Sequence, residues 1–204
     1  PPGDTVLAAQ KISDLLGKHQ APIRYVSPQA NMPNLIGSIN GFSEGRHLVL
    51  NGHIDVFPVS EKAKEEGWIT PPWSGEIIDN KIYGRGSTDM KCGTSASIWT
   101  YIILNYFRSS LKGKLTLTCV SDEETFGPWG ARWLIENEPD VLGDCCLNGE
   151  PSSPFTIRYA EKGLLWLTFK VQTDGSHGAY THLSKSANRV CLLYTSDAAD
   201  EEDS

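Results

Sequence analysis

The chain has 204 residues, of which 39% are hydrophobic and 21% charged, and this composition is that of a globular protein with a buried core. Its formal charge is −7, but residues 191–204 contribute five acidic side chains and no Lys or Arg. No basic stripe is available to neutralise phosphates, so we expect no nucleic-acid partner. No apolar run reaches the roughly 18 residues of a membrane span, so we expect no membrane insertion.

The first half of the chain shows one helical pattern followed by short strand patterns. An opening helix that ends at Gly17 is predicted by apolar residues on one face, namely Ala8, Ile12, Leu15 and Leu16. Short apolar runs predict strands over 35–39 and 47–50. Residues 76–83 are expected to form a hairpin that turns at Asp79 and Asn80.

In the second half of the chain, predicted helices alternate with predicted strands. We expect a helix over 91–107, apolar nearly all round and therefore buried against a sheet. A strand over 115–120 follows, then a helix with Pro128 in its first turn, and then a strand over 145–147. This alternation predicts an α/β sheet, in which functional side chains gather at the carboxyl ends of the strands.

The sequence pattern changes near Gly163, where we expect a domain boundary between 1–162 and the residues that follow. A long strand is predicted over 164–173 and the start of a helix over 183–190. The chain has an odd number of cysteines, five, and two of them, Cys145 and Cys146, are adjacent. This favours reduced thiols and a cytoplasmic location over a disulfide framework.

His53 and Asp55 come directly after the strand predicted over 47–50. Side chains two residues apart on extended backbone leave the same face, so the imidazole could bind a metal with the carboxylate beside it. Read alone, the pair also fits a surface turn after a strand.

Asp89 stands between a glycine-rich turn and the helix predicted over 91–107. Its carboxylate could bridge two cations, or it could simply cap the helix. A dinucleotide-binding turn is a third reading of Gly84-x-Gly86, but the sixth position of that motif is Asp89 instead of glycine.

Glu123 and Glu124 are adjacent acids at the end of the strand predicted over 115–120. Their mutual repulsion would be costly without a cation, so one can serve as ligand and the other as base, although three acids over 122–124 also fit a solvated loop. Glu150 follows the strand predicted over 145–147. Because these acids and His53 all follow strands of one sheet, the sequence predicts a catalytic zinc site or a similar divalent-ion site.

Other hydrolase and redox motifs are absent from the sequence. It contains no His-Glu-x-x-His helix, no Gly-x-Ser-x-Gly elbow and no Cys-x-x-Cys pair. Read by themselves, His177 and His182 are ordinary surface histidines.

Four segments together resemble one family: Asn-Gly-His-Ile-Asp over 51–55, Gly-Arg-Gly-Ser-Thr-Asp-Met-Lys over 84–91, Asp-Glu-Glu over 122–124, and Gly-Glu-Pro-Ser over 149–152. They resemble the zinc-dependent amidohydrolases and exopeptidases that include aminoacylase, acetylornithine deacetylase, succinyl-diaminopimelate desuccinylase and carboxypeptidase G. The resemblance implies an α/β catalytic domain, incomplete here, with a mixed sheet and flanking helices. It also implies that a small α+β lid and dimerisation domain starts at 163.

The resemblance also implies a site with two divalent metal ions, zinc in the first place and otherwise Co²⁺ or Mn²⁺. His53 and Glu150 would bind the first ion, Asp89 would bridge both, and Glu124 would bind the second. A cis peptide is expected between Asp89 and Met90.

The same resemblance assigns catalytic roles to three residues. Asp55 would orient His53, and Glu123 would be the general base. His177 would reach the active site of the partner subunit in a homodimer formed through the lid.

The implied function is hydrolysis of the amide bond of N-acyl amino acids or small peptides. We expect the chain to be the N-terminal part of such an enzyme, without the final metal-binding histidine, with 163–190 as the start of the lid. Residues 191–204 resemble non-native read-through, or else a natural acidic tail. Two alternatives stay open: a catalytically incomplete fragment that acts only in dimerisation or ligand binding, and a nucleotide-binding oxidoreductase.

Overall fold

The structure is a computed structural model, and it describes residues 4–62, 67–153, 155–160, 163, 165, 167, 168 and 170–172. The chain divides into two units, Pro1–Thr156 and Ile157–Ser204. The boundary predicted at Gly163, and the strand and helix predicted beyond it, fall mostly outside the described residues and stay predictions.

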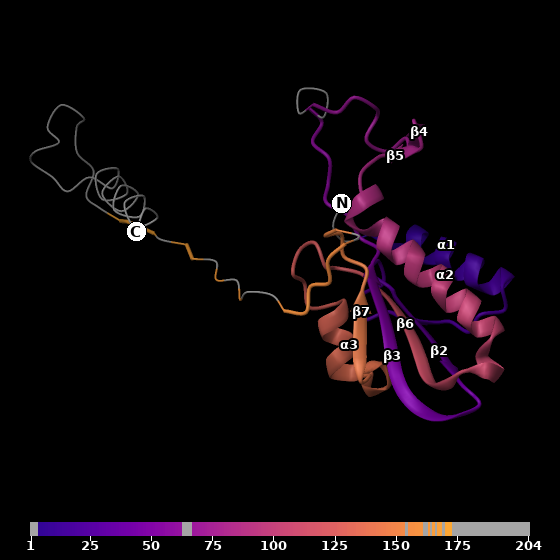
Figure 1. The fold of residues 1–204 in the computed structure, drawn as a ribbon. Coiled ribbons are helices and arrows are strands. Elements are labelled where there is room, and N and C mark those ends of the chain that lie inside the picture. Colours follow the sequence, from indigo (N-terminus) through magenta and orange to yellow (C-terminus); the bar gives the residue numbers. More distant parts are fainter. Residues whose placement is uncertain are drawn as a thin grey trace, which may run out of the picture. The chain divides into compact units, whose positions relative to one another are not determined.

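A five-stranded mixed sheet forms the centre of the first unit, in the order β1-β2-β6-β3-β7 (Figure 1). Its strands are β1 (Arg24–Val26), β2 (Asn34–Asn40), β3 (Ser43–His53), β6 (Lys112–Val120) and β7 (Cys145–Asn148). The pairs β1–β2 and β2–β6 are antiparallel, whereas β3 is parallel to both β6 and β7. The predicted α/β sheet with flanking helices is therefore confirmed. The sequence missed β1, because this strand has three residues and two of them are exposed.

Helices cover both faces of the sheet: α1 (Val6–Lys18), α2 (Gly93–Tyr106) and α3 (Ala131–Asn137). Leu35 and Ile36 are consecutive on β2, so their side chains point to opposite faces. Leu35 belongs to the larger core cluster, together with Leu16 of α1 and Tyr101 of α2. Ile36 belongs to a smaller cluster that contains Leu134 of α3. The alternation along one strand thus explains why α1 and α2 lie on one face and α3 on the other.

The ends of two helices differ from the sequence prediction. Gly17 lies inside α1, and the left-handed residue after this helix is Gln20, with φ of 52°. Pro128 precedes α3, which begins only at Ala131. The reason is local, because the carboxylate of Asp122 accepts a hydrogen bond from the Trp129 backbone N–H and holds this part of the chain in a loop.

The helix α2 is buried on one side only, contrary to the prediction that it is buried all round. Ile98 and Ile102 are buried, whereas Trp99 and Ile103 are 46% and 51% exposed. None of the helices in the described part of the chain is both long and apolar enough to cross a bilayer.

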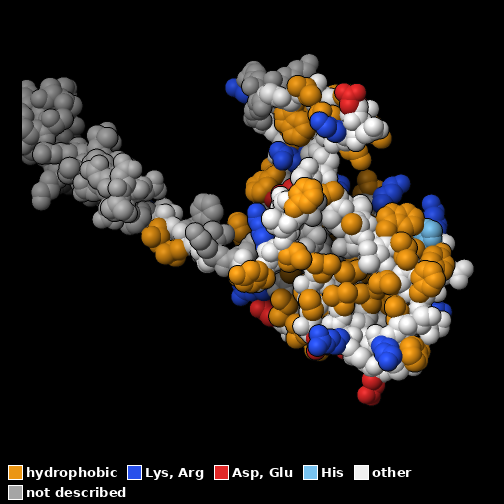
Figure 2. All heavy atoms as spheres, viewed as in Figure 1, with side chains coloured by type: hydrophobic (Ala, Val, Ile, Leu, Met, Phe, Trp, Pro, Cys, Tyr) orange, Lys and Arg blue, Asp and Glu red, His pale blue; other side chains and the backbone are white. Residues whose placement is uncertain are grey.

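The predicted hairpin forms a separate two-stranded sheet from β4 (Glu76–Ile78) and β5 (Lys81–Tyr83). Its turn residues Asp79 and Asn80 both have positive φ, which the sequence indicated by placing Asp and Asn there. Figure 2 shows exposed hydrophobic side chains over this projecting segment and across the face of the main body, and Ile77 and Ile82 of the hairpin are among those exposed. The other short helical elements are two 3₁₀ helices, Arg108–Ser110 and Pro139–Val141, and the kinked segment Ser87–Cys92 before α2.

Replacing Leu117 with Ala should lower the free energy of unfolding by about 2–5 kcal/mol, because this fully buried β6 side chain would leave a cavity in the larger core. Leu7→Ala is the matched control. Leu7 is 71% exposed on α1, so its loss should change stability by less than about 0.5 kcal/mol. Urea unfolding of both variants measures the difference, and equal effects would contradict the assigned core.

Candidate metal centre

The acidic segments meet where the three parallel strands end. In the register of the sheet, His53 of β3 lies opposite Val120 of β6, and Asn51 lies opposite Asn148 of β7. The carboxyl ends of these strands are therefore at the same edge. As the sequence predicted, His53 and the loops that carry Glu123 and Glu150 are brought together there.

Asp89 reaches this edge from a kinked segment, Ser87–Cys92, that precedes α2. Asp89 and Met90 have non-helical backbone angles, and the peptide bond between them is cis, as the resemblance implied. The residue that caps α2 is Cys92, which makes no side-chain capping bond. The reading of Asp89 as a helix cap is therefore wrong.

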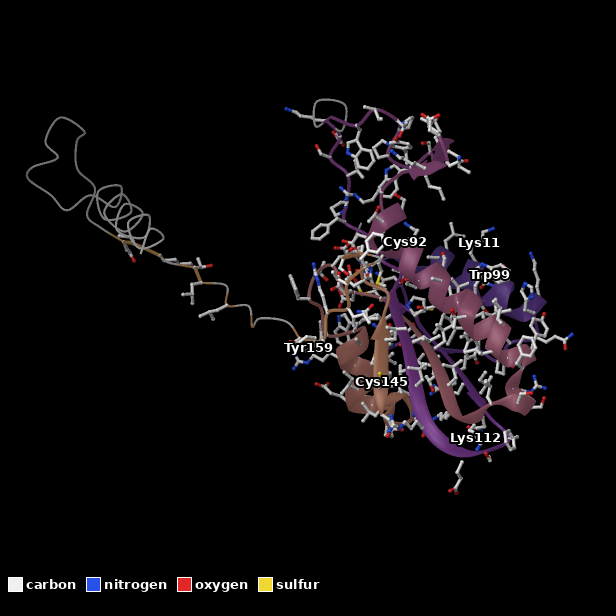
Figure 3. All side chains as sticks on the ribbon, viewed as in Figure 1. Lys11, Cys92, Trp99, Lys112, Cys145 and Tyr159 are labelled. Atoms are coloured by element: carbon white, nitrogen blue, oxygen red, sulfur yellow. The ribbon has the colours of Figure 1, made fainter. Side chains whose placement is uncertain are left out.

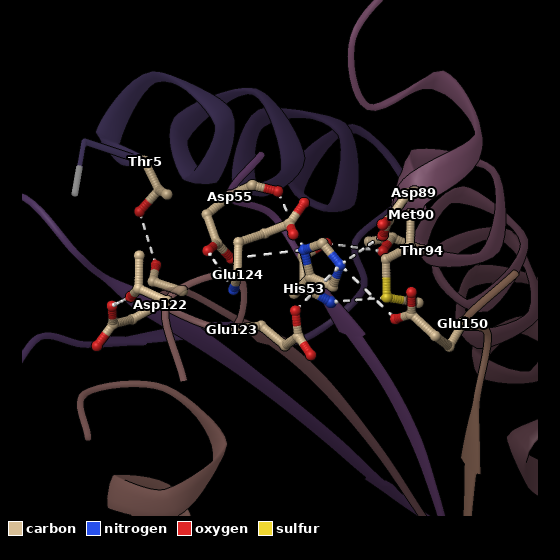
Figure 4. Close-up of polar contacts among 12 residues, drawn as sticks. Thr5, His53, Asp55, Asp89, Met90, Thr94, Asp122, Glu123, Glu124 and Glu150 are labelled. Atoms are coloured by element: carbon tan, nitrogen blue, oxygen red, sulfur yellow. Dashed lines mark hydrogen bonds and ion pairs between the residues drawn. The ribbon is translucent and has the colours of Figure 1, made fainter. Parts of the chain in front are cut away.

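Three carboxylates lie around Nε2 of His53 (Figure 4). His53 itself is buried, with only 2% of its surface exposed. Nε2 lies 3.0 Å from Oδ1 of Asp89, 3.6 Å from Oε2 of Glu150 and 3.8 Å from Oε2 of Glu123. The three acidic side chains are between 39% and 53% exposed. One side of the group is thus buried in the protein and the other is open to a ligand.

The other ring nitrogen of His53, Nδ1, faces Asp55. The backbone carbonyl of Asp55 is 3.0 Å from Nδ1, and its Oδ1 is 3.5 Å away. The carbonyl is therefore the closer partner, and the Asp55 carboxylate is held in place by accepting the Glu124 backbone N–H at 3.0 Å through Oδ2. A proton on Nδ1 leaves Nε2 free to accept or to bind a metal.

The charges of the group are strongly coupled. Burial lowers the pKa of His53, but the hydrogen bond and charge of Asp55, with Asp89 and Glu123, outweigh it and raise the pKa to about 9. Burial tends to raise the pKa of Asp55, but hydrogen bonds from His53 and from the backbone N–H groups of Glu124 and Glu123 hold it below its ordinary value.

Burial and the nearby carboxylate of Asp89 raise the pKa of Glu150 to about 7. The same two causes raise the pKa of Glu124. Carboxylates this close repel one another, and a cation among them removes that repulsion.

The residues present fit a divalent cation. His53, Asp89 and Glu150 each offer one ligand atom, and these three atoms lie within 4.8 Å of one another. One imidazole and two carboxylates, with a solvent-facing side, form the donor set of a catalytic zinc site with an open position. Glu124 does not belong to this group of three. The structure therefore brings together the ligands of one metal ion and does not define the ligands of a second ion.

The acids at the end of β6 are not a solvated loop. Asp122 and Glu124 are 5% and 9% exposed, and only Glu123 faces solvent to a large extent. Asp122 has φ of 67° and its carboxylate accepts hydrogen bonds from Thr125 and from the Trp129 backbone. Sequence reasoning gave Asp122 no role, and only its place in an acidic run pointed to it.

Sequence reasoning also missed the close packing that holds the strands against α2. Thr94 donates a hydrogen bond to the backbone carbonyl of His53 at 2.9 Å. A side chain at Gly52 would overlap the Thr94 hydroxyl, and a side chain at Gly93 would overlap the carbonyl of Gly149. The glycines next to the recognised motifs were the available signal, since they allow close backbone approach.

His177 lies outside the described residues, so its expected role stays a prediction. The four described cysteines are free thiols, and none belongs to the metal-binding group. Figure 3 shows Cys92 where α2 begins and Cys145 at the opposite end of the sheet.

Comparison with known proteins identifies the family. Residues 49–195 match peptidase family M20/M25/M40. The chain belongs to this family. The match begins in β3 and takes in every residue of the metal-binding group, so the predicted resemblance is confirmed and the dinucleotide reading of Gly84 and Gly86 is set aside.

The chain is similar to several succinyl-diaminopimelate desuccinylases. It is 33% identical to that of Wolinella succinogenes over 175 residues, which are 78% of this chain and 45% of that protein. It is 36% identical to that of Sulfurovum sp. over 71% of this chain and 39% of that protein. The chain therefore spans less than half the length of these relatives.

Two solved structures share the fold of this chain. Human carnosine dipeptidase 1 aligns with a TM-score of 0.56 and 22% identity, over 74% of this chain and 36% of that one. The M20 family metallo-carboxypeptidase Sso-CP2 from Sulfolobus solfataricus aligns with a TM-score of 0.55 and 20% identity, over 72% of this chain and 34% of that one.

Replacing Gly93 with Ala should weaken zinc binding about 10- to 100-fold, as is typical when support for a ligand is lost. The added methyl group would push away the Gly149 carbonyl and displace Glu150, the next residue. Competition with a chromophoric chelator measures the affinity.

Gly17→Ala is the control, because nothing lies within 4 Å of the added methyl group and Ala should stabilise α1 by up to about 1 kcal/mol. Unchanged zinc affinity in a folded Gly93→Ala variant would contradict the packing argument.

Proposed function

We propose that this chain supplies the N-terminal catalytic portion of a metal-dependent hydrolase that cleaves amide bonds in N-acyl amino acids or small peptides. The observation that carries the proposal is the meeting of His53, Asp89 and Glu150 within 4.8 Å in a member of a peptidase family. The similarity to succinyl-diaminopimelate desuccinylases supports an acylated amino acid as substrate. Because the chain spans less than half of these relatives, activity belongs to the full-length protein.

His53, Asp89 and Glu150 would hold the first divalent ion, and zinc suits their donor atoms best, with Co²⁺ or Mn²⁺ as alternatives. Asp89 would bridge to a second ion that Glu124 also binds. When bound, such ions polarise the amide carbonyl and lower the pKa of water.

Glu123 is the general base in this proposal. Its carboxylate is 48% exposed and lies 3.8 Å from Nε2 of His53, so it can reach a water molecule on the open side of the group. It takes the proton of the attacking water and returns it to the leaving amine nitrogen. Asp55 keeps His53 in the tautomer and orientation that leave Nε2 free, chiefly through its backbone carbonyl.

The full-length protein is proposed to form a homodimer through the lid domain that starts at 163, in which His177 contributes to the partner's active site. The free thiols of the described cysteines support a cytoplasmic location.

A second candidate follows from the length of the chain. Since it covers about 45% of the Wolinella relative, this chain by itself would be a fragment that binds ligand or dimerises without turnover. Metal binding and activity therefore need separate measurements.

Zinc should raise the thermal stability of the 204-residue chain, because it binds the folded group and removes the repulsion among its carboxylates. At a zinc concentration 100 times the dissociation constant, the stabilisation should be about 2.7 kcal/mol, and EDTA should reverse it. Thermal unfolding followed by circular dichroism measures the shift.

The substitutions His53→Gln and Glu150→Gln should each abolish most of this shift. His19→Gln should leave it intact, because His19 contacts Tyr106 at the far end of α2 and is not part of the group. A zinc shift that survives loss of His53 would refute the proposed centre.

In the full-length protein, Glu123→Ala should leave zinc content unchanged and lower kcat by about 10²- to 10⁴-fold, the usual contribution of a general base. Steady-state kinetics on an N-acyl amino acid, with metal analysis of the same sample, tests this. Glu44→Ala, at an exposed position of β3, should have full activity. Wild-type turnover without the Glu123 carboxylate would rule out its role as the base.

A further inference from the structure

Residues 121–130 form the loop that joins β6 to α3 and carries Glu123. The two ends of this loop lie close together, because an added methyl group at Gly130 would overlap the backbone carbonyl of Ser121. Inside the loop, the Phe126 backbone N–H donates to the carbonyl of Glu123 at 2.8 Å. The loop is therefore a closed turn, and its neck is the place where the backbone of Ser121 meets that of Gly130.

Asn34, the first residue of β2, joins the two ends of this loop from outside. Its Oδ1 accepts the Ser121 backbone N–H at 2.9 Å, and its Nδ2 donates to the Trp129 backbone carbonyl at 2.8 Å. Asn34 and Ser121 are both 0% exposed. Because a carboxamide carries an acceptor and a donor, one Asn side chain satisfies both ends, which an apolar side chain of similar size could not do.

The neck is also fixed to the rest of the first unit. The Ser121 hydroxyl donates to the backbone carbonyl of Pro33 at 2.7 Å, and the hydroxyl of Thr5 lies 2.6 Å from it. Pro33 is the residue before Asn34, so two consecutive residues hold Ser121 by its backbone and by its side chain. The start of the loop is therefore tied firmly to the start of β2.

Glu123 lies between two backbone N–H groups that distant side chains hold. Two residues before it, the Ser121 N–H bonds Asn34, and one residue after it, the Glu124 N–H donates to Oδ2 of Asp55 at 3.0 Å. The side chain of Glu123 is itself 48% exposed. Since a half-exposed side chain is less restricted by packing, the backbone on either side contributes most to where its carboxylate lies.

We propose that Asn34 is a positioning residue for the general base. By holding the neck of the loop closed, it fixes the backbone of Glu123 and so directs this carboxylate toward the metal-binding group. Asn34 does not belong to that group, so its effect on catalysis is transmitted through the loop. The inference rests on the proposed function, in which Glu123 is the base. A misplacement of about 1 Å can cost about 100-fold in rate.

A buried Asn that only stabilises the fold would behave differently, and Asn105 of α2 is the matched comparison. It is 2% exposed, and its Nδ2 donates to the backbone carbonyl of Gln20 at 3.3 Å. Loss of either side chain should lower the stability of the protein. Only loss of Asn34 should also displace Glu123.

The first test is a double-mutant cycle in the full-length protein, by steady-state kinetics on an N-acyl amino acid. Asn34→Ala should lower kcat about 10- to 100-fold, with zinc content and KM close to those of the wild type. In the Glu123→Ala background, the same substitution should change the residual kcat by no more than about twofold, because the group that it positions is gone. Asn105→Ala should keep kcat unchanged in both backgrounds. Equal losses from Asn34→Ala in the two backgrounds would reduce Asn34 to a structural role.

The second test is hydrogen exchange in the 204-residue chain in EDTA, which needs neither metal nor turnover. Asn34→Ala should speed exchange of the backbone amides of Glu124, Phe126 and Gly127 about tenfold, because their hydrogen bonds depend on a closed loop. Asn105→Ala should leave these amides unchanged. Nuclear magnetic resonance measures the rates residue by residue, and unchanged rates in Asn34→Ala would overturn the proposal.

Gly130→Ala opens the same neck from the side of the loop and serves if Asn34→Ala does not fold. It should give the same loss of kcat and the same faster exchange. Wild-type turnover in Glu123→Ala would refute the base and with it the catalytic role of Asn34. If Glu123→Ala is inactive but exchange in the Asn34 variant is unchanged, the positioning role alone is refuted.

Discussion

The parallel pairing of β3 with β6 on one side and β7 on the other is the constraint on which the candidate site depends. Parallel strands end at the same edge of a sheet, so the residues that follow them become neighbours although up to about a hundred positions separate them in sequence. His53 ends β3, and the loops after β6 and β7 carry Glu123 and Glu150. An antiparallel β7 would place Glu150 at the far edge.

The fold holds acidic side chains closer together than their charges favour. Asp55 is stabilised as a carboxylate by His53 and by backbone N–H groups, whereas the pKa values of Glu124 and Glu150 are raised. The Asp55 carboxylate on the buried side of the group is thus stabilised in its charged form by the protein itself, and the solvent side carries excess negative charge. A divalent cation offsets that charge, and this physical requirement agrees with membership of the M20/M25/M40 family.

Two contacts between uncharged groups bring the metal-binding residues into position. The backbones of Gly93 and Gly149 approach so closely that neither position has room for a side chain, which brings the loop after β7 against the start of α2. The Thr94 hydroxyl ties the same helix to the carbonyl of His53. The kinked segment before α2, which carries Asp89, thus contacts β3, which ends at His53.

The sequence by itself determined the type of fold, most of the strands, the hairpin turn and the three residues that meet in the metal-binding group, His53, Asp89 and Glu150. Strand patterns, glycines and acids are local signals, and four motifs in the right order were enough to identify the family. The errors of the sequence prediction arose where contacts decide the outcome. The start of α3 depends on the hydrogen bond that Asp122 accepts from Trp129, and the burial of α2 depends on which side of this helix packs against the sheet.

Only the tertiary structure decided which atoms come together. Strand order and direction place Glu150 and Asp89 at Nε2 of His53, whereas Glu124 is not part of this group of three and donates its backbone N–H to the carboxylate of Asp55. Distances between residues far apart in sequence depend on packing across the whole sheet, and spacing along the chain does not encode them.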